Sequence, residues 1–126
     1  YPPTLIEIAG SKNILFKEEV FGPVVAIIKF EDEEKVVAMA NDTNYGLAGG
    51  VWTQDISRAL RVASSIDAGY LWVNTYGGII PETPYGGFKQ SGVGKELGSE
   101  GLEEYIRTKN ISIFTGSSLP SWYGKK

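Results

Sequence analysis

Two carboxylates and an aromatic ring stand close together within residues 18–21, directly before an apolar run, and they are the clearest candidates for binding chemistry. In an extended backbone, adjacent side chains point to opposite faces, so Glu18 and Glu19 do not share one site and a hydrolase with paired carboxylates is disfavoured. Glu19 and Phe21 lie two positions apart and face the same side. A carboxylate can accept hydrogen bonds from both hydroxyls of a ribose while an aromatic ring packs against a flat heterocycle. The alternative from spacing alone is a solvated Glu19 and a Phe21 in the core.

The glycine-rich stretch at residues 84–95 invites comparison with phosphate-binding loops, but its spacing matches none of them. A Walker loop places Ser or Thr after its Lys, whereas Lys95 is followed by Glu96. The dinucleotide-binding fingerprint needs a third Gly where Leu97 stands. We therefore expect a tight loop that uses positive φ angles and lets its backbone approach another segment closely.

The chain contains no Cys and no His. It therefore lacks a thiolate nucleophile, the usual zinc ligands and the commonest general base. Lys89, Lys95 and Tyr85 have no sequence neighbour that would shift a pKa, so we expect them to serve in packing or at the surface. The sequence predicts no catalytic residue and no metal site within this chain.

Composition excludes several classes of protein. Hydrophobic residues make up 42% of the 126 residues and charged residues 21%, as in an ordinary globular domain. The net charge of -3 offers no basic surface for nucleic acid or an anionic membrane, and no apolar run is long enough to span a bilayer. Without disulfides, we expect a cytoplasmic protein. The opening residues, which do not begin with Met, lead us to expect a piece of a longer protein.

The elements that must position these residues alternate between strand and helix patterns. Strands joined through helices return parallel to one another by right-handed crossovers, which predicts an α/β fold with a three-layer parallel sheet. A strand-like stretch at residues 5–8 comes first, and the expected order is then strand 24–30, buried on both faces, helix 32–41, strand 49–53, helix 55–66 and strand 70–74.

Finer expectations concern the ends and faces of these elements. Carboxylates fill the first turn of the helix at 32–41, and Asp55 is the expected N-cap of the next helix. Gly69 is expected in a left-handed conformation after that helix. The expected apolar stripe of the second helix is Ile56, Ala59, Leu60 and Ala63, and the expected core or half-core aromatics are Trp52, Tyr70 and Trp72.

The C-terminal third is less regular. Residues 75–98 show no periodicity and contain two prolines, and structureless segments of this length are uncommon unless they are functional. A short helix capped by Ser99 is expected at residues 99–106. Ile111 and Ile113 alternate with a Ser in an expected final strand.

Four segments together resemble successive motifs of one family. EEVFGPV at 18–24, NDTNYGLA at 41–48, WVN at 72–74 and PYGGFKQSGVGKE at 84–96 occur in the order and spacing of the NAD(P)-dependent aldehyde dehydrogenases. The resemblance covers nearly the whole chain. It implies that residues 1–108 are the C-terminal part of the catalytic domain, without its nucleophile segment, and that residues 109–126 are an oligomerisation strand and tail.

The resemblance also implies roles for single residues. In the family, the residue matching Glu19 binds hydroxyls of the nicotinamide ribose, and the residue matching Phe21 packs against the nicotinamide. The loop from Asn74 to Tyr85 matches one that lines the aldehyde tunnel, with Ile79 and Tyr85 at positions that contact substrate. The family's Cys nucleophile, general-base Glu, oxyanion-stabilising Asn and Rossmann fold all precede the matched region.

The implied function is oxidation of an aldehyde to a carboxylic acid with NAD or NADP by the full-length enzyme, through a Cys thiohemiacetal. The intact protein is expected to be a homodimer or homotetramer, and this chain alone is expected to be inactive. Two alternatives stay open: a non-enzymatic scaffolding member of the same fold, and a relative that acts on semialdehydes or forms acyl-CoA.

Overall fold

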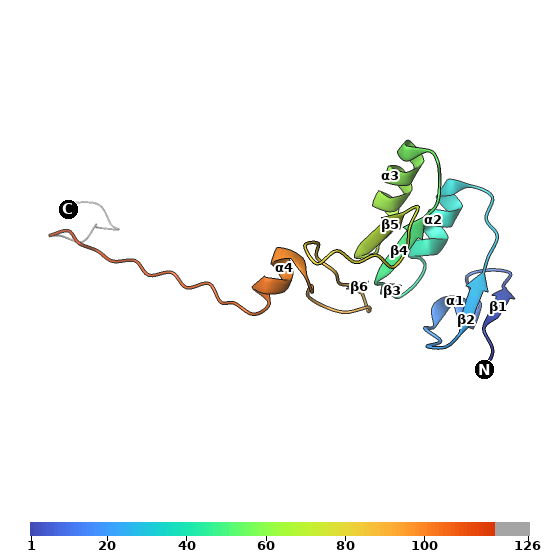
Figure 1. Cartoon of the computed structure of the whole chain (residues 1–126), viewed down its shortest axis with the longest axis horizontal. Coiled ribbons are helices and arrows are strands. Elements are labelled where there is room, and N and C mark those ends of the chain that lie inside the picture. Colours follow the sequence, from blue (N-terminus) through green and yellow to red (C-terminus); the bar gives the residue numbers. More distant parts are fainter. Residues whose placement is uncertain (118–126) are drawn as a thin grey trace, which may run out of the picture.

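The computed structural model describes residues 1–117, and its first part is a small parallel pair of strands. β1 (Thr4–Glu7) pairs with β2 (Val24–Ile27), with Thr4 opposite Val24 and Glu7 opposite Ile27. Between them lies α1 (Ile14–Lys17), whose first turn is capped by the Asn13 side chain. We refer to residues 1–30 as the N-terminal unit, drawn in blue in Figure 1.

Residues 31–105 form the second unit. Its central parallel pair joins β4 (Ala48–Val51) to β5 (Tyr70–Val73), with α3 (Ile56–Ser65) as the crossover that packs on both strands. α2 (Glu33–Asn41) lies beside α3 (Figure 1). The remaining elements are β3 (Tyr45–Gly46), paired antiparallel with β6 (Phe88–Lys89), and α4 (Gly98–Glu103).

Both long helices start at an aspartate. The Asp32 carboxylate accepts a hydrogen bond from the Lys35 backbone N–H, and the Asp55 carboxylate accepts from the backbone N–H groups of Ser57 and Arg58. These bonds stabilise the charged form, so the pKa of each carboxyl lies below its usual value. The acidic start expected for the first helix and the cap at Asp55 are confirmed.

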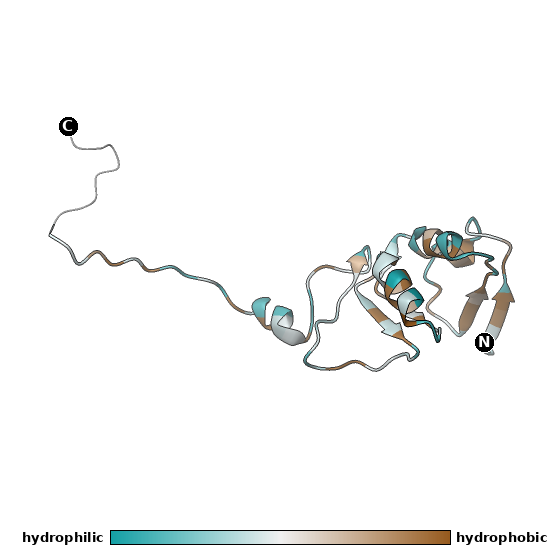
Figure 2. Ribbon diagram, turned by 90° about the horizontal axis from the view of Figure 1, so that it is seen from above, coloured by the Kyte–Doolittle hydropathy of each residue, from teal (hydrophilic) through white to brown (hydrophobic). Residues whose placement is uncertain are grey.

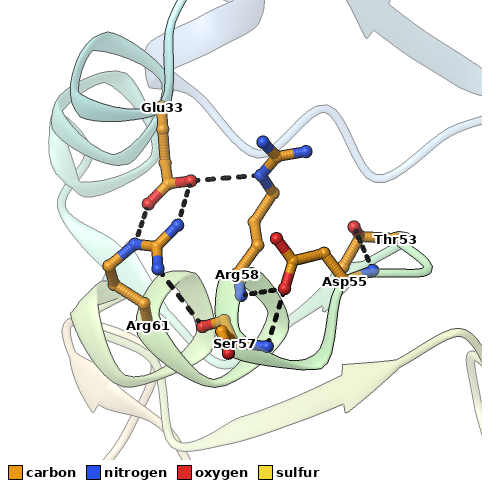
Figure 3. Close-up of polar contacts among 6 residues, drawn as sticks. All are labelled: Glu33, Thr53, Asp55, Ser57, Arg58 and Arg61. Carbon is orange, nitrogen blue, oxygen red and sulfur yellow. Dashed lines mark hydrogen bonds and ion pairs between the residues drawn. The ribbon is translucent and has the colours of Figure 1, made fainter.

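Charged side chains connect the start of α2 to the first half of α3 (Figure 3). Glu33 accepts from both Nε and Nη2 of Arg61, the latter at 2.8 Å, and its carboxylate lies 3.3 Å from Arg58 Nε. The hydrogen bonds from Arg61, and then those from Arg58, hold the pKa of Glu33 below its usual value. The two helices are thereby fixed side by side.

The core of the described residues is small. Its buried apolar side chains are Ile8, Ala59, Val62 and Trp72. The stripe expected on α3 is therefore partly wrong: Ala59 is buried, but Ile56 and Leu60 are exposed and Val62 faces inward instead. Trp52, expected in the core, is 61% exposed, whereas Tyr70 is half-buried as expected.

The parallel α/β fold is confirmed, with a difference in how the strands associate. The described strands form three separate two-stranded sheets, and β2 is hydrogen-bonded to β1 rather than to β4. β2 is also covered on one face only, because Val25 and Ile27 are exposed. The apolar colour of β2 in Figure 2 shows the composition that led us to expect this strand to be buried on both faces.

Two local expectations are wrong. α3 ends at Ser65 with Ile66 as its C-cap, so Gly69 is not the left-handed residue that terminates it. α4 begins one residue before Ser99, and its N-cap is Leu97, which makes no side-chain capping bond. The final strand expected around Ile111 and Ile113 has no pairing partner within the described part of the chain and stays a prediction: from residue 106 to 117 an exposed, extended segment leads away from α4 (Figure 1).

The glycine-rich loop behaves as expected. A Cβ on Gly69 would overlap the backbone carbonyl of Gly86, and a Cβ on Gly86 would lie 2.7 Å from the carbonyl oxygen of Gly94. Gly92 and Gly94 have positive φ angles. The loop therefore packs backbone against backbone, a contact that larger residues would prevent.

Among residues 1–117, no helix has the length and apolar character needed to cross a membrane.

Candidate functional site

An open groove of about 680 Å³ separates the N-terminal unit from the second unit. Glu18, Glu19 and Phe21 line one side of it. The opposite side is formed by the turn after α2, by β3 and β4, by the end of α3 and by the turn after β6. Its lining residues there are Ala40, Thr43, Tyr45, Gly46, Leu47, Ala48, Gly49, Gly50, Ile66, Asp67, Ala68, Gln90 and Ser91.

The structure brings Glu19 and Phe21 together on this groove, although not by the extended backbone that we expected. Phe21 has a φ of 48°, which turns the chain directly before β2, and its ring is 91% exposed. Glu18 also lines the groove, so the alternation of faces expected for residues 18 and 19 is wrong. The open Phe21 ring argues against the core role that spacing alone had allowed.

Hydrogen bonds between side chains and backbone groups, and one between two backbone groups, hold the opposite wall in place. The Ser91 hydroxyl accepts from the Gly46 N–H at 3.0 Å, and the Gln90 N–H donates to the Asn44 carbonyl at 2.9 Å. The Asn41 side chain donates to the Ser65 carbonyl and accepts from the Asp67 N–H, each at 2.8 Å. The ends of α2 and α3 are therefore fixed to one another beneath the groove.

The charged side chains that line the groove are all acidic. Its ionisable lining residues are the carboxylates Glu18, Glu19 and Asp67 and the phenol of Tyr45, with no Lys or Arg among them. Such walls suit hydroxyl groups and flat neutral or cationic rings, and they disfavour phosphates. Among residues 1–117, no group of three or more acidic side chains could hold a metal ion.

The two residues expected at a substrate tunnel lie elsewhere in the second unit. Tyr85 is half-buried, and its ring centroid is 5.6 Å from that of Tyr70. Tyr70 in turn lies 4.8 Å from Trp72, whose Nε1 donates to the Gly78 carbonyl at 2.7 Å. Ile79, next to Gly78, is 45% exposed. An aromatic row thus supports the loop that carries Ile79.

The lysines considered as acid–base groups have structural partners. Lys89 Nζ donates to the carbonyls of Asn41 and Thr43 and lies 3.4 Å from Asp67. Lys95 Nζ donates to the Gly86 carbonyl at 2.8 Å and lies 4.6 Å from the centre of the Phe88 ring. Both contacts fix loops, in agreement with the packing role expected from sequence.

Sequence reasoning missed several residues of the site. Lys17, at the end of α1, donates to the Asp42 carbonyl across the molecule. Gln90 and Ser91 line the groove far from Glu19 in sequence. The polar run at residues 41–44, directly after a helix, was the available signal that this turn has partners.

Comparison with known proteins gives a consistent result. Residues 1–111 match the aldehyde dehydrogenase family. The chain is 43% identical over 123 residues to a betaine aldehyde dehydrogenase of Bacillus subtilis (strain 168), covering 98% of this chain and 25% of that protein. The chain therefore spans about a quarter of the length of this relative.

Solved structures agree. Betaine aldehyde dehydrogenase from Staphylococcus aureus in complex with NAD+ superposes with a TM-score of 0.89 at 44% identity, covering 98% of this chain and 24% of that one. An apo mutant form of the same Staphylococcus aureus enzyme gives a TM-score of 0.89 at 44% identity, with 98% and 25% covered. With the family matched over residues 1–111, this chain belongs to the aldehyde dehydrogenase family.

Proposed function

We propose that the full-length protein is an NAD(P)-dependent aldehyde dehydrogenase that oxidises an aldehyde to a carboxylic acid through a Cys thiohemiacetal. The observation that carries this proposal is the groove lined by both Glu19 and Phe21. Family membership and the NAD+ complex of a relative at 44% identity support it. Bound NAD or NADP supplies the hydride acceptor.

Within this proposal, the groove holds the nicotinamide riboside end of the cofactor. Glu19 accepts hydrogen bonds from the ribose hydroxyls, and the exposed ring of Phe21 packs against the nicotinamide. The carboxylates along the groove favour the positively charged oxidised ring over a phosphate group. The pyrophosphate is bound by a part of the protein outside this chain.

The remaining regions receive corresponding roles. Residues 1–108 form the C-terminal part of the catalytic domain, and the loop bearing Ile79 and Tyr85 lines the path of a small aldehyde. Residues 109–126 supply an oligomerisation strand and tail, although residues 118–126 lie outside the described part of the chain. The extended, exposed backbone at 106–117 suits pairing with a neighbouring subunit in a homodimer or homotetramer of a cytoplasmic enzyme.

This chain alone neither oxidises aldehydes nor binds NAD tightly. A charge-assisted hydrogen bond contributes roughly 1.5 to 3 kcal/mol and an aromatic contact roughly 0.5 to 1.5 kcal/mol. Micromolar binding requires about 8 kcal/mol, which Glu19 and Phe21 do not supply by themselves. Micromolar affinity of the isolated chain for NAD in calorimetry would contradict this part of the proposal.

The test uses the full-length protein, an aldehyde panel with NAD and NADP, and absorbance of the reduced cofactor. Glu19→Gln should weaken cofactor affinity by roughly tenfold to a hundredfold, because a charge-assisted hydrogen bond is weakened. Phe21→Ala should weaken it by about two- to tenfold. Both variants should keep the thermal stability of the parent protein.

Glu18→Gln is the matched control, since Glu18 lines the same groove and carries the same charge. It should lower affinity far less than Glu19→Gln does. No reduction of either cofactor with any aldehyde, together with a full-length sequence that has no Cys at the nucleophile position, would favour the scaffolding alternative. Activity that requires coenzyme A would favour an acyl-CoA-forming relative.

A further inference from the structure

The two walls of the groove belong to different units of the fold, the N-terminal unit and the second unit. Glu19 and Phe21 belong to the N-terminal unit, whereas Thr43, Gln90 and Ser91 belong to the second unit. β1 and β2 pair only with each other among the described strands, so no shared sheet fixes the distance between the two walls. Whatever connects the units therefore sets the width of the groove.

Asp42 of the second unit makes that connection, through an ion pair with Lys17 and a hydrogen bond from the Ser11 hydroxyl. Lys17 Nζ donates to the Asp42 carbonyl at 2.6 Å and lies 2.7 Å from Asp42 Oδ1. Within residues 1–117, this is the one ion pair that joins the N-terminal unit to the second unit. The other lysine paired in the N-terminal unit, Lys29, lies 2.9 Å from Glu7 of the same unit.

Both partners of this pair are well anchored. Lys17 is the last residue of α1, and Glu19 follows it by two residues. Asp42 caps the end of α2 through its N–H bond to Met39, and the neighbouring Asn41 side chain is bonded to the end of α3 and to Asp67. The hydrogen bond from Lys17, followed by one from the Ser11 hydroxyl, keeps the pKa of Asp42 below its usual value, so the pair is charged at neutral pH.

We propose that Lys17 is a positioning residue for the cofactor: its bonds to Asp42 hold Glu19 and Phe21 at the separation from the opposite wall that the nicotinamide riboside requires. Neither Lys17 nor Asp42 lines the groove, so both act through the segment that Lys17 anchors. This inference rests on the function proposed above.

The test measures NAD affinity and steady-state kinetics of the full-length protein. Lys17→Met keeps the apolar stem and removes the charge, and it should raise both the Kd and the KM for NAD about fivefold, as expected for loss of a partly exposed ion pair. The kcat and the KM for aldehyde should change by less than about twofold, because the reacting groups are untouched. Lys17→Arg retains the cation and should restore NAD affinity close to that of the parent protein.

Two controls separate this role from a general effect of lost charge. Lys29→Met removes an ion pair confined to the N-terminal unit and should leave the Kd for NAD unchanged. Asp42→Asn removes the charge of the ion pair from the other side but keeps the backbone carbonyl to which Lys17 donates, so it should weaken NAD binding less than Lys17→Met does. The double variant, Lys17→Met with Asp42→Asn, should bind NAD no more weakly than Lys17→Met alone.

The outcomes distinguish the two levels of the proposal. If the unsubstituted protein binds no NAD and reduces none, the proposed function is wrong and this inference with it. If NAD binds normally and Lys17→Met leaves its Kd unchanged, or if Lys29→Met weakens binding equally, the positioning role alone is overturned.

Discussion

The N-terminal unit and the second unit are held together in different ways. In the second unit, helix ends, loops and strands are fixed to one another by side-chain bonds from Asn41, Asn74 and Lys89 and by close backbone packing at Gly69. The N-terminal unit has one short parallel pair of strands and joins its neighbour through Lys17 and Ser11, which both bond to Asp42. The interlocked unit should govern stability, and the loosely joined unit should govern how well the groove binds.

The strongest test of this comparison substitutes one glycine in each unit. Gly69→Ala places a Cβ against the Gly86 carbonyl, a backbone atom that cannot move aside cheaply, and should cost about 3 kcal/mol. Gly10→Ala in the N-terminal unit meets no heavy atom within 4 Å and should be close to neutral. Thermal unfolding and soluble yield of the full-length protein measure both. Equal melting temperatures for the two variants would contradict the inference that the second unit governs stability.

A second pair compares asparagines. Asn74 has a φ of 54°, and its side chain both accepts from the Thr53 N–H and donates to the Thr53 carbonyl, each at 2.8 Å. Asn74→Ala should cost about 2 to 3 kcal/mol through these lost bonds and the left-handed backbone. Asn13→Ala removes one capping bond from α1 and should cost about 1 kcal/mol.

Asn74→Gly separates the two contributions, since glycine accepts the left-handed backbone but supplies no hydrogen bond. Its unfolding midpoint in the full-length protein should fall between those of the parent and Asn74→Ala. A midpoint equal to that of the parent would mean that the bonds to Thr53 contribute nothing.

The smallest expected effect concerns ion pairs and pH. Because the hydrogen bonds from Arg61 lower the pKa of Glu33 in the folded protein, their contribution is present above the usual carboxyl value of 4.5 and is lost as the pH falls below it. Glu33→Gln should therefore lower the melting temperature slightly at pH 7, and the difference from the parent protein should shrink as the pH falls below 4.5.

The control for this prediction is Glu7→Gln, which breaks the exposed pair with Lys29 inside the N-terminal unit and should have a smaller effect at pH 7. Melting curves of both variants between about pH 3 and pH 7 make the comparison. If the difference in melting temperature between Glu33→Gln and the parent protein grows as the pH falls, the hydrogen bonds from Arg61 to Glu33 are not its cause.

Local sequence signals predicted local structure well. The aspartates that begin α2 and α3, the existence of the strand β2 and the close packing of the glycine-rich loop depend on residues near in sequence, and they were found as expected. The burial of β2 on both faces depends on distant partners and was not. Pairing between strands depends on partners distant in the chain, so the separate sheets were not predictable from periodicity. Ile56 and Leu60 fit a helical stripe, yet they are exposed because nothing in the described residues covers that side of α3.

The candidate site was predictable as residue types but not as a geometry. Glu19 and Phe21 were singled out by spacing, although an extended backbone was the wrong reason for their shared orientation. The positive φ of Phe21 and the contact of Lys17 with a residue 25 positions away leave no local signature. The roles of Ile79 and Tyr85 stay predictions, as do those of Glu19 and Phe21.

The backbone of Phe21 has a consequence for how this turn can vary. A left-handed conformation costs a non-glycine residue roughly 1 to 2 kcal/mol, and the ring of Phe21 recovers little by burial because it is open to solvent. Glycine would relax the turn and remove the aromatic surface in the same step. Folding therefore favours glycine at position 21, because glycine adopts the left-handed turn without strain. Ligand binding favours phenylalanine, because only an aromatic residue gives the groove a ring.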